Sequence, residues 1–239
     1  MSLRLSCLAI GTAMGLMTAA SGQTFVGHVM MNDSYGPNPG GEFRGIVEPD
    51  FTFIPGATGT PFQFGLPAAP GRFESFCLEA HELLDFEVGA FRADVDVQTT
   101  AGSPGYAGGA MGGINDPLDA RTAYLYHHFI YQSLVTPYDY ATEAVRIDDA
   151  TALQTAIWFI EQESSDPLAG KALLFFNEAN AAVNSGAWTG LGDVRVLSLY
   201  QVNNGVRTEF QDVLVIVPAP GAGLALGMGA LLAARRRRR

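Results

Sequence analysis

The chain has 239 residues, of which 14 are basic and 24 acidic, and its formal net charge is −10. Six of the basic residues are Arg4 and the five arginines that close the chain, whereas every acidic residue lies between these ends. The middle of the chain is therefore strongly acidic and repels nucleic acid and anionic lipid headgroups, which excludes a nucleic-acid-binding function.

The N-terminus has the three zones of a secretory signal peptide. One positive charge at Arg4 precedes an apolar run over Leu5–Met17, and small residues follow it. We therefore expect residues 1–22 to be removed on export, with cleavage after Ala20 or Gly22. A buried first helix is the alternative, but the run shows no amphipathic period.

The next part of the chain is predicted to form β-strands separated by turns. From Thr24 to about Leu66, short apolar runs such as FVGHVMM and GIVEPDFTFI are broken by YGPNPGG and PGATGTP. FESFCLEAHELLDFEV continues the pattern, with Phe73, Ser75 and Cys77 on one face of a strand. Residues 99–113 are rich in glycine and have no apolar period, so we expect a long loop.

Three helices are predicted in the middle of the chain. The first opens at Asp116-Pro117, a favourable pair for an N-cap and a first turn. The second opens at Asp148-Asp149 and continues through ATALQTAIWFIEQE, whose apolar residues recur at helical spacing. The third extends from about Lys171 to Val183, with Asn184 and Gly186 as terminators.

Strands return after the helices. DVRVLSLYQV and VRTEFQDVLVIV flank the turn signal Asn203-Asn204-Gly205, which predicts a β-hairpin. Strands, a helical block and strands again indicate an α+β domain over residues 23–216. We expect a β-strand framework, sandwich- or barrel-like, with the helical block inserted into it.

The C-terminus combines an apolar stretch with a basic end. Only Pro218 and Pro220 interrupt the uncharged run before the terminal arginines. The unbroken part, Gly221–Ala234, is short for the roughly 30 Å hydrocarbon core of a bilayer, but the arginines fix its orientation because positive charge stays on the cytoplasmic side. A nucleic-acid-binding patch is the competing interpretation, and the acidic remainder of the chain disfavours it.

Residues 217–239 resemble the PEP-CTERM sorting tail, in which a short proline motif precedes an apolar helix and an arginine cluster. Val-Pro-Ala-Pro lacks the glutamate of the usual Val-Pro-Glu-Pro. The resemblance implies recognition by an exosortase-type membrane protease, transient anchoring in the membrane by the C-terminal helix, and a final place at the cell surface or in the extracellular matrix. The residues of this sorting signal are Val217, Pro218, Ala219, Pro220, Arg235, Arg236, Arg237, Arg238 and Arg239.

Two short motifs bear on chemistry: FCLE at 76–79 and LQTAIW at 153–158. They resemble the two signatures of the bacterial Cys–Gln thioester domain, also called the TQXA domain, with Leu153 in place of the threonine that names the family. The residues that support the two motifs are Phe76, Leu78, Glu79, Leu153, Ile157 and Trp158.

The resemblance implies an internal thioester between Cys77 and Gln154. The thiol displaces ammonia from the carboxamide, and a primary amine, such as a lysine of an unknown surface or protein partner, later displaces the thiolate. The result is a single covalent attachment, which is adhesion and not enzymatic turnover, and it requires neither a cofactor nor a metal ion. The chain itself has one lysine, Lys171, so few internal amines compete.

Other interpretations of Cys77 stay open. Cys7 lies in the expected signal peptide, so Cys77 has no cysteine partner and is alternatively a buried small hydrophobe. The protein would then be a structural surface or matrix protein of unknown ligand. A cysteine peptidase that uses His127 or His128 is a further alternative, although no protease signature surrounds Cys77.

The four histidines are candidates for two other roles. His81 or His128 is a candidate general base toward an incoming amine. Adjacent histidines such as 127 and 128 lack the i, i+4 spacing of helical metal ligands, so we predict no metal site from them or from His28.

Overall fold

The computed structural model describes residues 24–33, 35, 41–52, 71–80, 82, 84–100 and 115–217. The expected signal peptide, residues 218–239 of the expected sorting tail, His81 and most of the expected glycine-rich loop lie outside the described residues. No helix within these ranges is long and apolar enough to cross a membrane.

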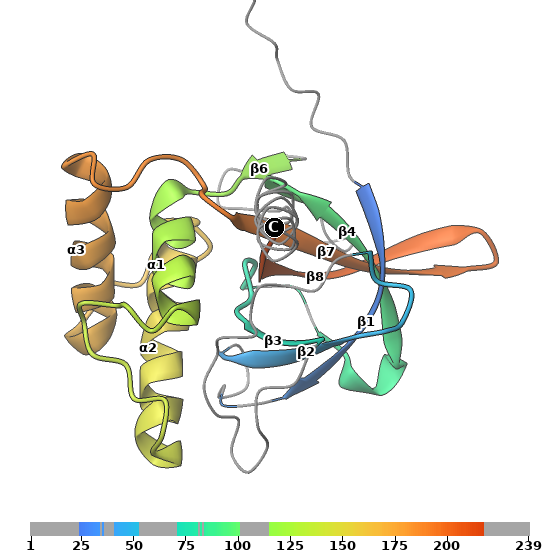
Figure 1. Ribbon diagram of the computed structural model, residues 1–239, viewed down its shortest axis with the longest axis horizontal. Helices are drawn as coiled ribbons and strands as arrows, with labels where there is room; N and C mark the ends of the chain where they lie inside the picture. The colour runs from blue at the N-terminus through green and yellow to red at the C-terminus, as the bar shows by residue number, and fades with distance from the viewer. Residues whose placement is uncertain are drawn as a thin grey trace, which may run out of the picture.

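Six antiparallel strands form one sheet in the order β3-β2-β1-β4-β7-β8 (Figure 1). With the three helices it makes the chain an α+β protein, as the order of elements in the sequence predicts. A short 3-10 helix, η2 (Phe86–Val88), precedes β4, and β5 and β6 pair with each other outside this sheet. The strands are β1 (Thr24–Asp33), β2 (Phe43–Val47), β3 (Arg72–Ser75), β4 (Ala90–Asp96), β5 (Gln98–Thr100), β6 (Asn115–Pro117), β7 (Val194–Asn203) and β8 (Val206–Ile216).

The two edges of the sheet meet just after β3. Residues 76–78 pair with residues 212–214 of β8 through two backbone hydrogen bonds of 3.0 and 3.2 Å. Cys77 lies between these bonds, opposite Val213, in an antiparallel bridge. A residue in this position directs its own N–H and C=O away from the partner strand. The backbone groups of Cys77 are therefore available to a group on the other side.

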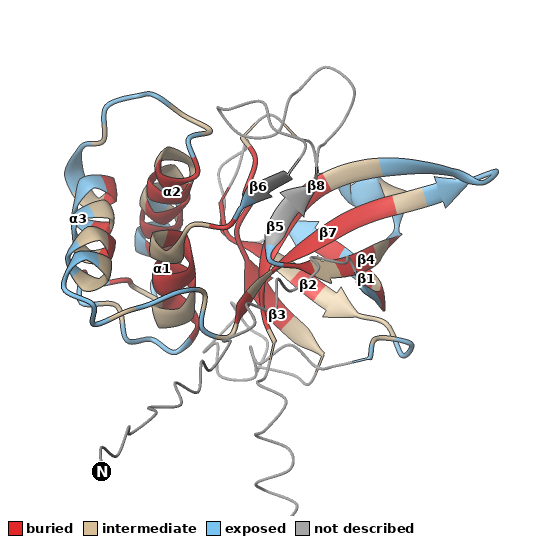
Figure 2. Cartoon of the chain, turned by 90° about the horizontal axis from the view of Figure 1, so that it is seen from above, coloured by how far each residue is buried: buried red, intermediate tan, exposed pale blue. Residues whose placement is uncertain are grey.

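The three helices lie together on one side of the sheet, with α3 farthest from it (Figures 1 and 2). They are α1 (Ala120–Ile130), α2 (Glu143–Ile160) and α3 (Gly170–Asn184). Buried residues concentrate where α1 and α2 face the strands (Figure 2). Phe76 and Phe129 of α1 illustrate this packing, since their rings meet edge to face at a centroid distance of 5.0 Å.

The first helix begins later than predicted. Asp116 and Pro117 belong to β6, which pairs with β5. The N-cap is Asp119, whose carboxylate accepts a hydrogen bond from the Arg121 N–H at 2.7 Å. Both aspartates are suitable caps, and the pairing with β5 excludes the earlier one from the helix.

The second helix begins earlier than predicted, at Glu143, so the Asp148-Asp149 pair lies inside it. Asp149 is buried, and its carboxylate accepts a hydrogen bond from the Asp139 N–H at 2.7 Å. An acidic residue that resembles an N-cap in the sequence here binds a loop that precedes the helix. The prediction was wrong because the partner N–H lies ten positions earlier in the chain.

The third helix and the final hairpin are confirmed. Gly186, with φ +74°, follows the end of α3. Asn204 and Gly205 connect β7 to β8 with φ values of +53° and +80°. A two-residue type I′ turn requires positive φ at both positions. The hairpin projects beyond the other strands (Figure 1).

A buried carboxamide on Cys77 as candidate functional site

The side-chain carboxamide of Gln154 lies against the backbone of Cys77. Its Nε2 donates to the Cys77 carbonyl at 2.8 Å, and its Oε1 accepts from the Cys77 N–H at 3.0 Å. The Gly41 N–H donates to the same Oε1 at 3.2 Å. Cys77 and Gln154 are 4% and 2% exposed. The carboxamide carbon is thus held beside the residue that carries the thiol.

The pairing of the neighbouring residues explains this contact. Because 76–78 pair with β8, the N–H and C=O of Cys77 point away from that strand. Gln154 satisfies both groups, as the backbone of a further strand would. A buried backbone group without such a partner costs free energy, so the position selects a side chain with both a donor and an acceptor.

The other motif residues are core residues that fix the two partners. Phe76 and Leu78, on either side of the cysteine, are fully buried. On α2, Leu153 and Ile157 are also fully buried, and Trp158 packs partly buried against the same core. Their packing positions residue 77 at the sheet and residue 154 on the helix.

Glu79, the last residue of FCLE, is 3% exposed and lies among other carboxyl groups. Burial raises its pKa well above the usual value, and the neighbouring carboxyl groups of Glu82, Asp212 and Glu163 raise it further. Glu163 also binds this segment directly, since its Oε2 accepts from the Ala80 N–H at 3.2 Å. Glu79 therefore retains its proton at neutral pH.

The thiol of Cys77 is affected by the same surroundings. Burial raises its pKa well above the usual value, and the negative charge of Glu82 adds to the effect. The thiol is therefore uncharged at neutral pH. Peptidase cysteines are the opposite case, because a neighbouring cation lowers the pKa of the thiol.

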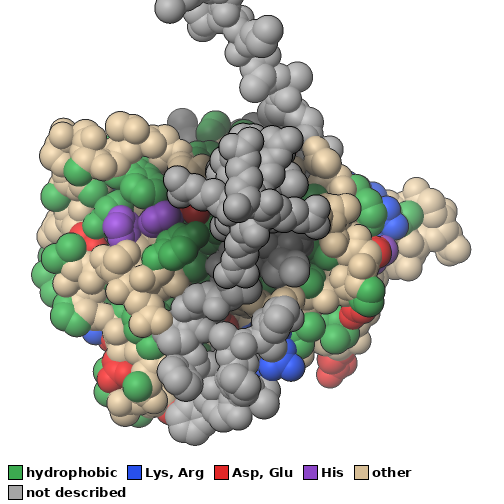
Figure 3. Space-filling model, viewed as in Figure 1, with side chains coloured by type: hydrophobic (Ala, Val, Ile, Leu, Met, Phe, Trp, Pro, Cys, Tyr) green, Lys and Arg blue, Asp and Glu red, His purple; other side chains and the backbone are tan. Residues whose placement is uncertain are grey.

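The structure places His127 and His128 in an aromatic cluster around Trp188. His127 Nδ1 lies 2.7 Å from Asp193 Oδ1, and His128 Nδ1 lies 2.6 Å from Ser133 Oγ. Ring centroids of the two histidines are 4.9 and 5.8 Å from that of Trp188. Figure 3 shows histidine side chains among hydrophobic ones on the outer face of the helices.

Among the described residues, neither His127 nor His128 hydrogen-bonds to Cys77 or Gln154. Burial lowers the pKa of His128, and the neighbouring His127 lowers it further. His28 lies elsewhere, at β1, with its Nδ1 2.5 Å from Asp50 Oδ2. Within the described ranges, no group of three or more His, Cys, Asp or Glu side chains is arranged to hold a metal ion.

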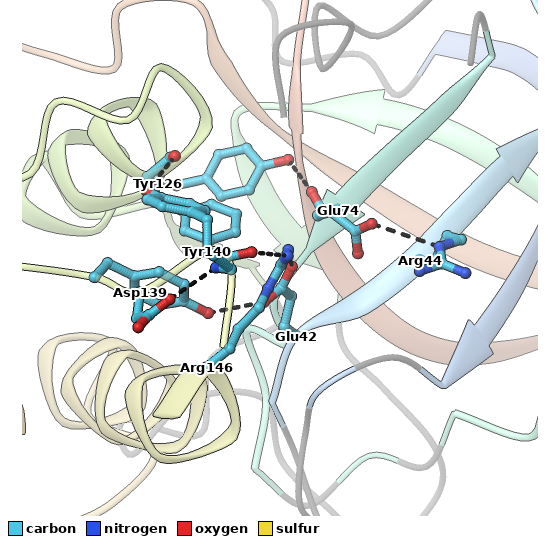
Figure 4. Close-up of polar contacts among 10 residues, drawn as sticks. Glu42, Arg44, Glu74, Tyr126, Asp139, Tyr140 and Arg146 are labelled. Atoms are coloured by element: carbon cyan, nitrogen blue, oxygen red, sulfur yellow. Dashed lines mark hydrogen bonds and ion pairs between the residues drawn. The ribbon is translucent and has the colours of Figure 1, made fainter. Parts of the chain in front are cut away.

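Sequence reasoning missed a buried ion pair next to this site. Glu42 follows Gly41, is 0% exposed and is bound by Arg146 of α2, which is 1% exposed (Figure 4). Arg146 Nε donates to Glu42 Oε2 at 2.9 Å, and Nη2 donates to Oε1. The Tyr138 hydroxyl donates to Glu42 Oε2 at 2.8 Å. Glu42 lies just after the turn sequence YGPNPGG. Its position at the start of a strand is the only feature of the sequence that could have indicated this ion pair.

The remaining described candidates are Lys171 and Val217. Lys171 of α3 forms an ion pair with the buried Asp149. Val217 directly follows β8, and its N–H donates to the Asp193 carbonyl at 2.8 Å. The start of the expected sorting tail is therefore bound to the folded domain.

No protein-family model matches this chain, and neither a curated protein nor a solved structure shows significant similarity to it.

Proposed function

We propose that Cys77 and Gln154 form an internal thioester that captures a primary amine on a surface or partner protein. The observation that supports this is the docking of the Gln154 carboxamide on Cys77, with both residues buried. The two residues are 77 positions apart, and each belongs to one of the two motifs.

The proposed chemistry has two balanced steps. The Cys77 sulfur bonds to the Gln154 carboxamide carbon, the C–N bond breaks, and ammonia leaves with the thiol proton. An amine then bonds to the same carbon, the C–S bond breaks, and the thiolate takes up the proton that the amine loses. Fixed orientation favours the first step, because well-aligned groups react as if present at about 10⁵ M or more.

The wider proposal concerns residues 23–216 as an exported adhesion domain. The order of elements in the sequence predicts a sandwich- or barrel-like β framework with an inserted helical block. The pairing of 76–78 with β8 and the position of α1, α2 and α3 between β6 and β7 support this description. An exosortase-type protease would act on the tail, and the domain would function at the cell surface or in the matrix.

The direct test is the intact mass of the folded domain. We expect the wild-type mass to be lower than the sequence mass by one ammonia, and Cys77→Ala or Gln154→Ala to restore the full value. Gln201→Ala is a suitable control because it removes a half-buried carboxamide that binds the Val88 carbonyl, away from Cys77. Its mass should still be one ammonia short.

The second candidate is a structural surface protein in which Cys77 stays a free thiol. The raised pKa of Cys77 favours it, since an uncharged buried thiol is inert. Gln154 would then serve only to satisfy the Cys77 backbone. A wild-type domain with the full sequence mass, whose thiol reacts with a thiol reagent only after the domain is unfolded, would select this candidate over the thioester.

A further inference from the structure

Two buried N–H groups converge on the oxygen of the Gln154 carboxamide. The Cys77 N–H donates to Oε1 at 3.0 Å and the Gly41 N–H at 3.2 Å, from segments 36 positions apart. Attack on the carboxamide carbon moves negative charge onto this oxygen. Pre-positioned donors at such an oxygen stabilise the tetrahedral intermediate and need no reorganisation during the reaction.

We propose that the N–H groups of Cys77 and Gly41 form an oxyanion hole for the Gln154 acyl group, and that Glu42, Arg146 and Tyr138 are positioning residues for it. This inference rests on the proposed thioester. It applies to both steps, since thioester formation and amine capture each pass through a tetrahedral intermediate on the same carbon.

The two donors are held by different parts of the fold. The Cys77 N–H is aimed by the pairing of residues 76–78 with β8. The Gly41 N–H depends on the segment before β2, where Gly41 adopts φ +132°, a conformation that residues with a side chain rarely adopt. The local sequence therefore does not by itself fix the direction of the Gly41 N–H.

The buried ion pair between Glu42 and Arg146 holds the segment that carries Gly41 in place. Glu42 is joined to Arg146 by two hydrogen bonds and to the Tyr138 hydroxyl by a third. Arg146 also donates from Nη1 to the Tyr140 carbonyl at 3.0 Å, and its guanidinium lies 4.0 Å from the ring centroid of Tyr35. Figure 4 shows Arg146 reaching from α2 toward Glu42.

The same helix carries the acyl group. Gln154 follows Arg146 on α2 by eight positions, about 12 Å along the helix axis. Through Arg146 and Glu42, α2 fixes the Gly41 donor, and through Gln154 it fixes the acceptor. The distance between the Gly41 N–H and Gln154 Oε1 is therefore set by α2 together with Glu42, which is ion-paired to it.

The chain offers a matched control for this arrangement. An arginine and a tyrosine, Arg207 and Tyr200, also bind the buried Asp94, although the Arg207 side chain is 32% exposed and also pairs with Glu209. Arg207 Nη1 donates to Asp94 Oδ2 at 2.7 Å, and the Tyr200 hydroxyl donates to Oδ1 at 3.0 Å. These residues lie on β4, β7 and β8, and none of them hydrogen-bonds to Gln154.

The experiment compares Tyr138→Phe and Arg146→Lys with Tyr200→Phe and Arg207→Lys, all in the full mature domain. Thioester content is read from intact mass, and the rate of capture of methylamine is read from release of the Cys77 thiol. Loss of one oxyanion donor typically slows acyl transfer by about 10²-fold, so we expect displacement of Gly41 in Arg146→Lys to slow capture by about tenfold. Tyr138→Phe should slow it less, and the two control variants should react at the wild-type rate.

A vibrational measurement separates positioning from general loss of stability. Hydrogen bonds to a carbonyl lower its stretching frequency, so with ¹³C-labelled glutamine the thioester band should move to higher frequency in Arg146→Lys. The band should stay in place in Arg207→Lys, even if both variants lose similar melting temperature. A folded Arg146→Lys domain that forms no thioester, while Arg207→Lys forms it fully, also supports the oxyanion hole.

Failure of the thioester proposal and failure of the oxyanion-hole proposal give different results. Wild-type domain with the full sequence mass and no methylamine adduct overturns the thioester itself. Wild-type domain that forms the thioester, together with Tyr138→Phe and Arg146→Lys variants that match it in capture rate and band position, overturns only the oxyanion hole and its positioning residues.

Discussion

A single side chain, Gln154, joins the sheet to the helices at the centre of this protein. It satisfies the N–H and C=O of Cys77 and binds the Gly41 N–H, all in a buried environment. A glutamine is suited to this position because its carboxamide both donates and accepts. The same fixed geometry places its carbon beside the residue that carries the thiol.

At this scale we expect amine capture to depend on Gln154 and on pH. A small primary amine should add once, at Gln154, and release a free thiol at Cys77. Capture should accelerate with rising pH because only the unprotonated amine attacks and the reference pKa of lysine is about 10.4. Peptide mapping of the adduct is the measurement.

Lys171→Arg is the control for this prediction, because it removes the only lysine of the chain and should leave capture of added amine unchanged. An adduct at a residue other than Gln154 would contradict the mechanism. So would the absence of any adduct from about pH 7 to 9 despite an intact thioester.

Glu79 should make the stability of the domain depend on pH. Its folded pKa is raised above its unfolded value, mainly by burial. The stabilisation is therefore complete below the unfolded pKa of about 4.3 and is lost as pH rises through neutrality, by at most about 1.4 kcal/mol per pH unit for one proton. Glu79→Gln, which is neutral at every pH, should flatten this slope in chemical unfolding experiments.

The exposed Glu87 of η2 provides the comparison, since Glu87→Gln should keep the wild-type slope. If Glu79→Gln also keeps that slope, burial of Glu79 among carboxyl groups does not control the pH response.

At the scale of elements, the Glu42–Arg146 pair ties α2 to the segment before β2. Removing one partner of a buried pair leaves an uncompensated charge, so Arg146→Ala should lower the free energy of unfolding by about 3–5 kcal/mol. The combined variant Glu42→Leu with Arg146→Met should recover much of that loss, since it buries no charge. Denaturant unfolding measures both, and a combined variant less stable than Arg146→Ala would contradict the expectation.

The β7–β8 hairpin depends on its turn. Gly205 has φ +80°, and a side chain there would meet nothing within 4 Å, so the cost of substitution is purely conformational. We expect Gly205→Ala to destabilise the domain by about 1–2 kcal/mol, measured by thermal unfolding. Gly205→Asn should cost less, because asparagine visits the left-handed region more readily. Equal losses in the two variants would show that backbone conformation is not the cause.

At the scale of the whole molecule, the chain separates its charges between the ends and the middle. All acidic residues lie between the arginine at position 4 and the arginine cluster at 235–239. On the sorting function proposed above, removing Arg235–Arg239 should impair membrane orientation, because positive charge is retained on the cytoplasmic side of a membrane. Fractionation of cells that express the truncated chain measures this.

Replacing the five arginines by lysines is the matched control, since it keeps the charge and should preserve orientation. A chain without the cluster that reaches the surface in unchanged amount and form would contradict the sorting proposal.

The sequence by itself determined those elements whose signal is local. The period of α3, its terminating Gly186 and the Asn204-Gly205 turn each act within a few residues, and the structure confirms them. Residue patterns also gave the α+β class. Interpretation of the local sequence misplaced the starts of α1 and α2. Asp116 pairs with Thr99 of β5, and Asp149 binds the Asp139 N–H, so neither residue serves as an N-cap.

Only the tertiary structure decided the geometry of the candidate site. The motifs singled out Cys77 and Gln154. No motif in the sequence indicates the hydrogen bond with Gly41 or the ion pair between Glu42 and Arg146. The contacts of the site join positions 77 to 113 apart in the chain. They form because packing of α2 on a curled sheet brings unsatisfied backbone groups and buried charges within reach of the partners that stabilise them.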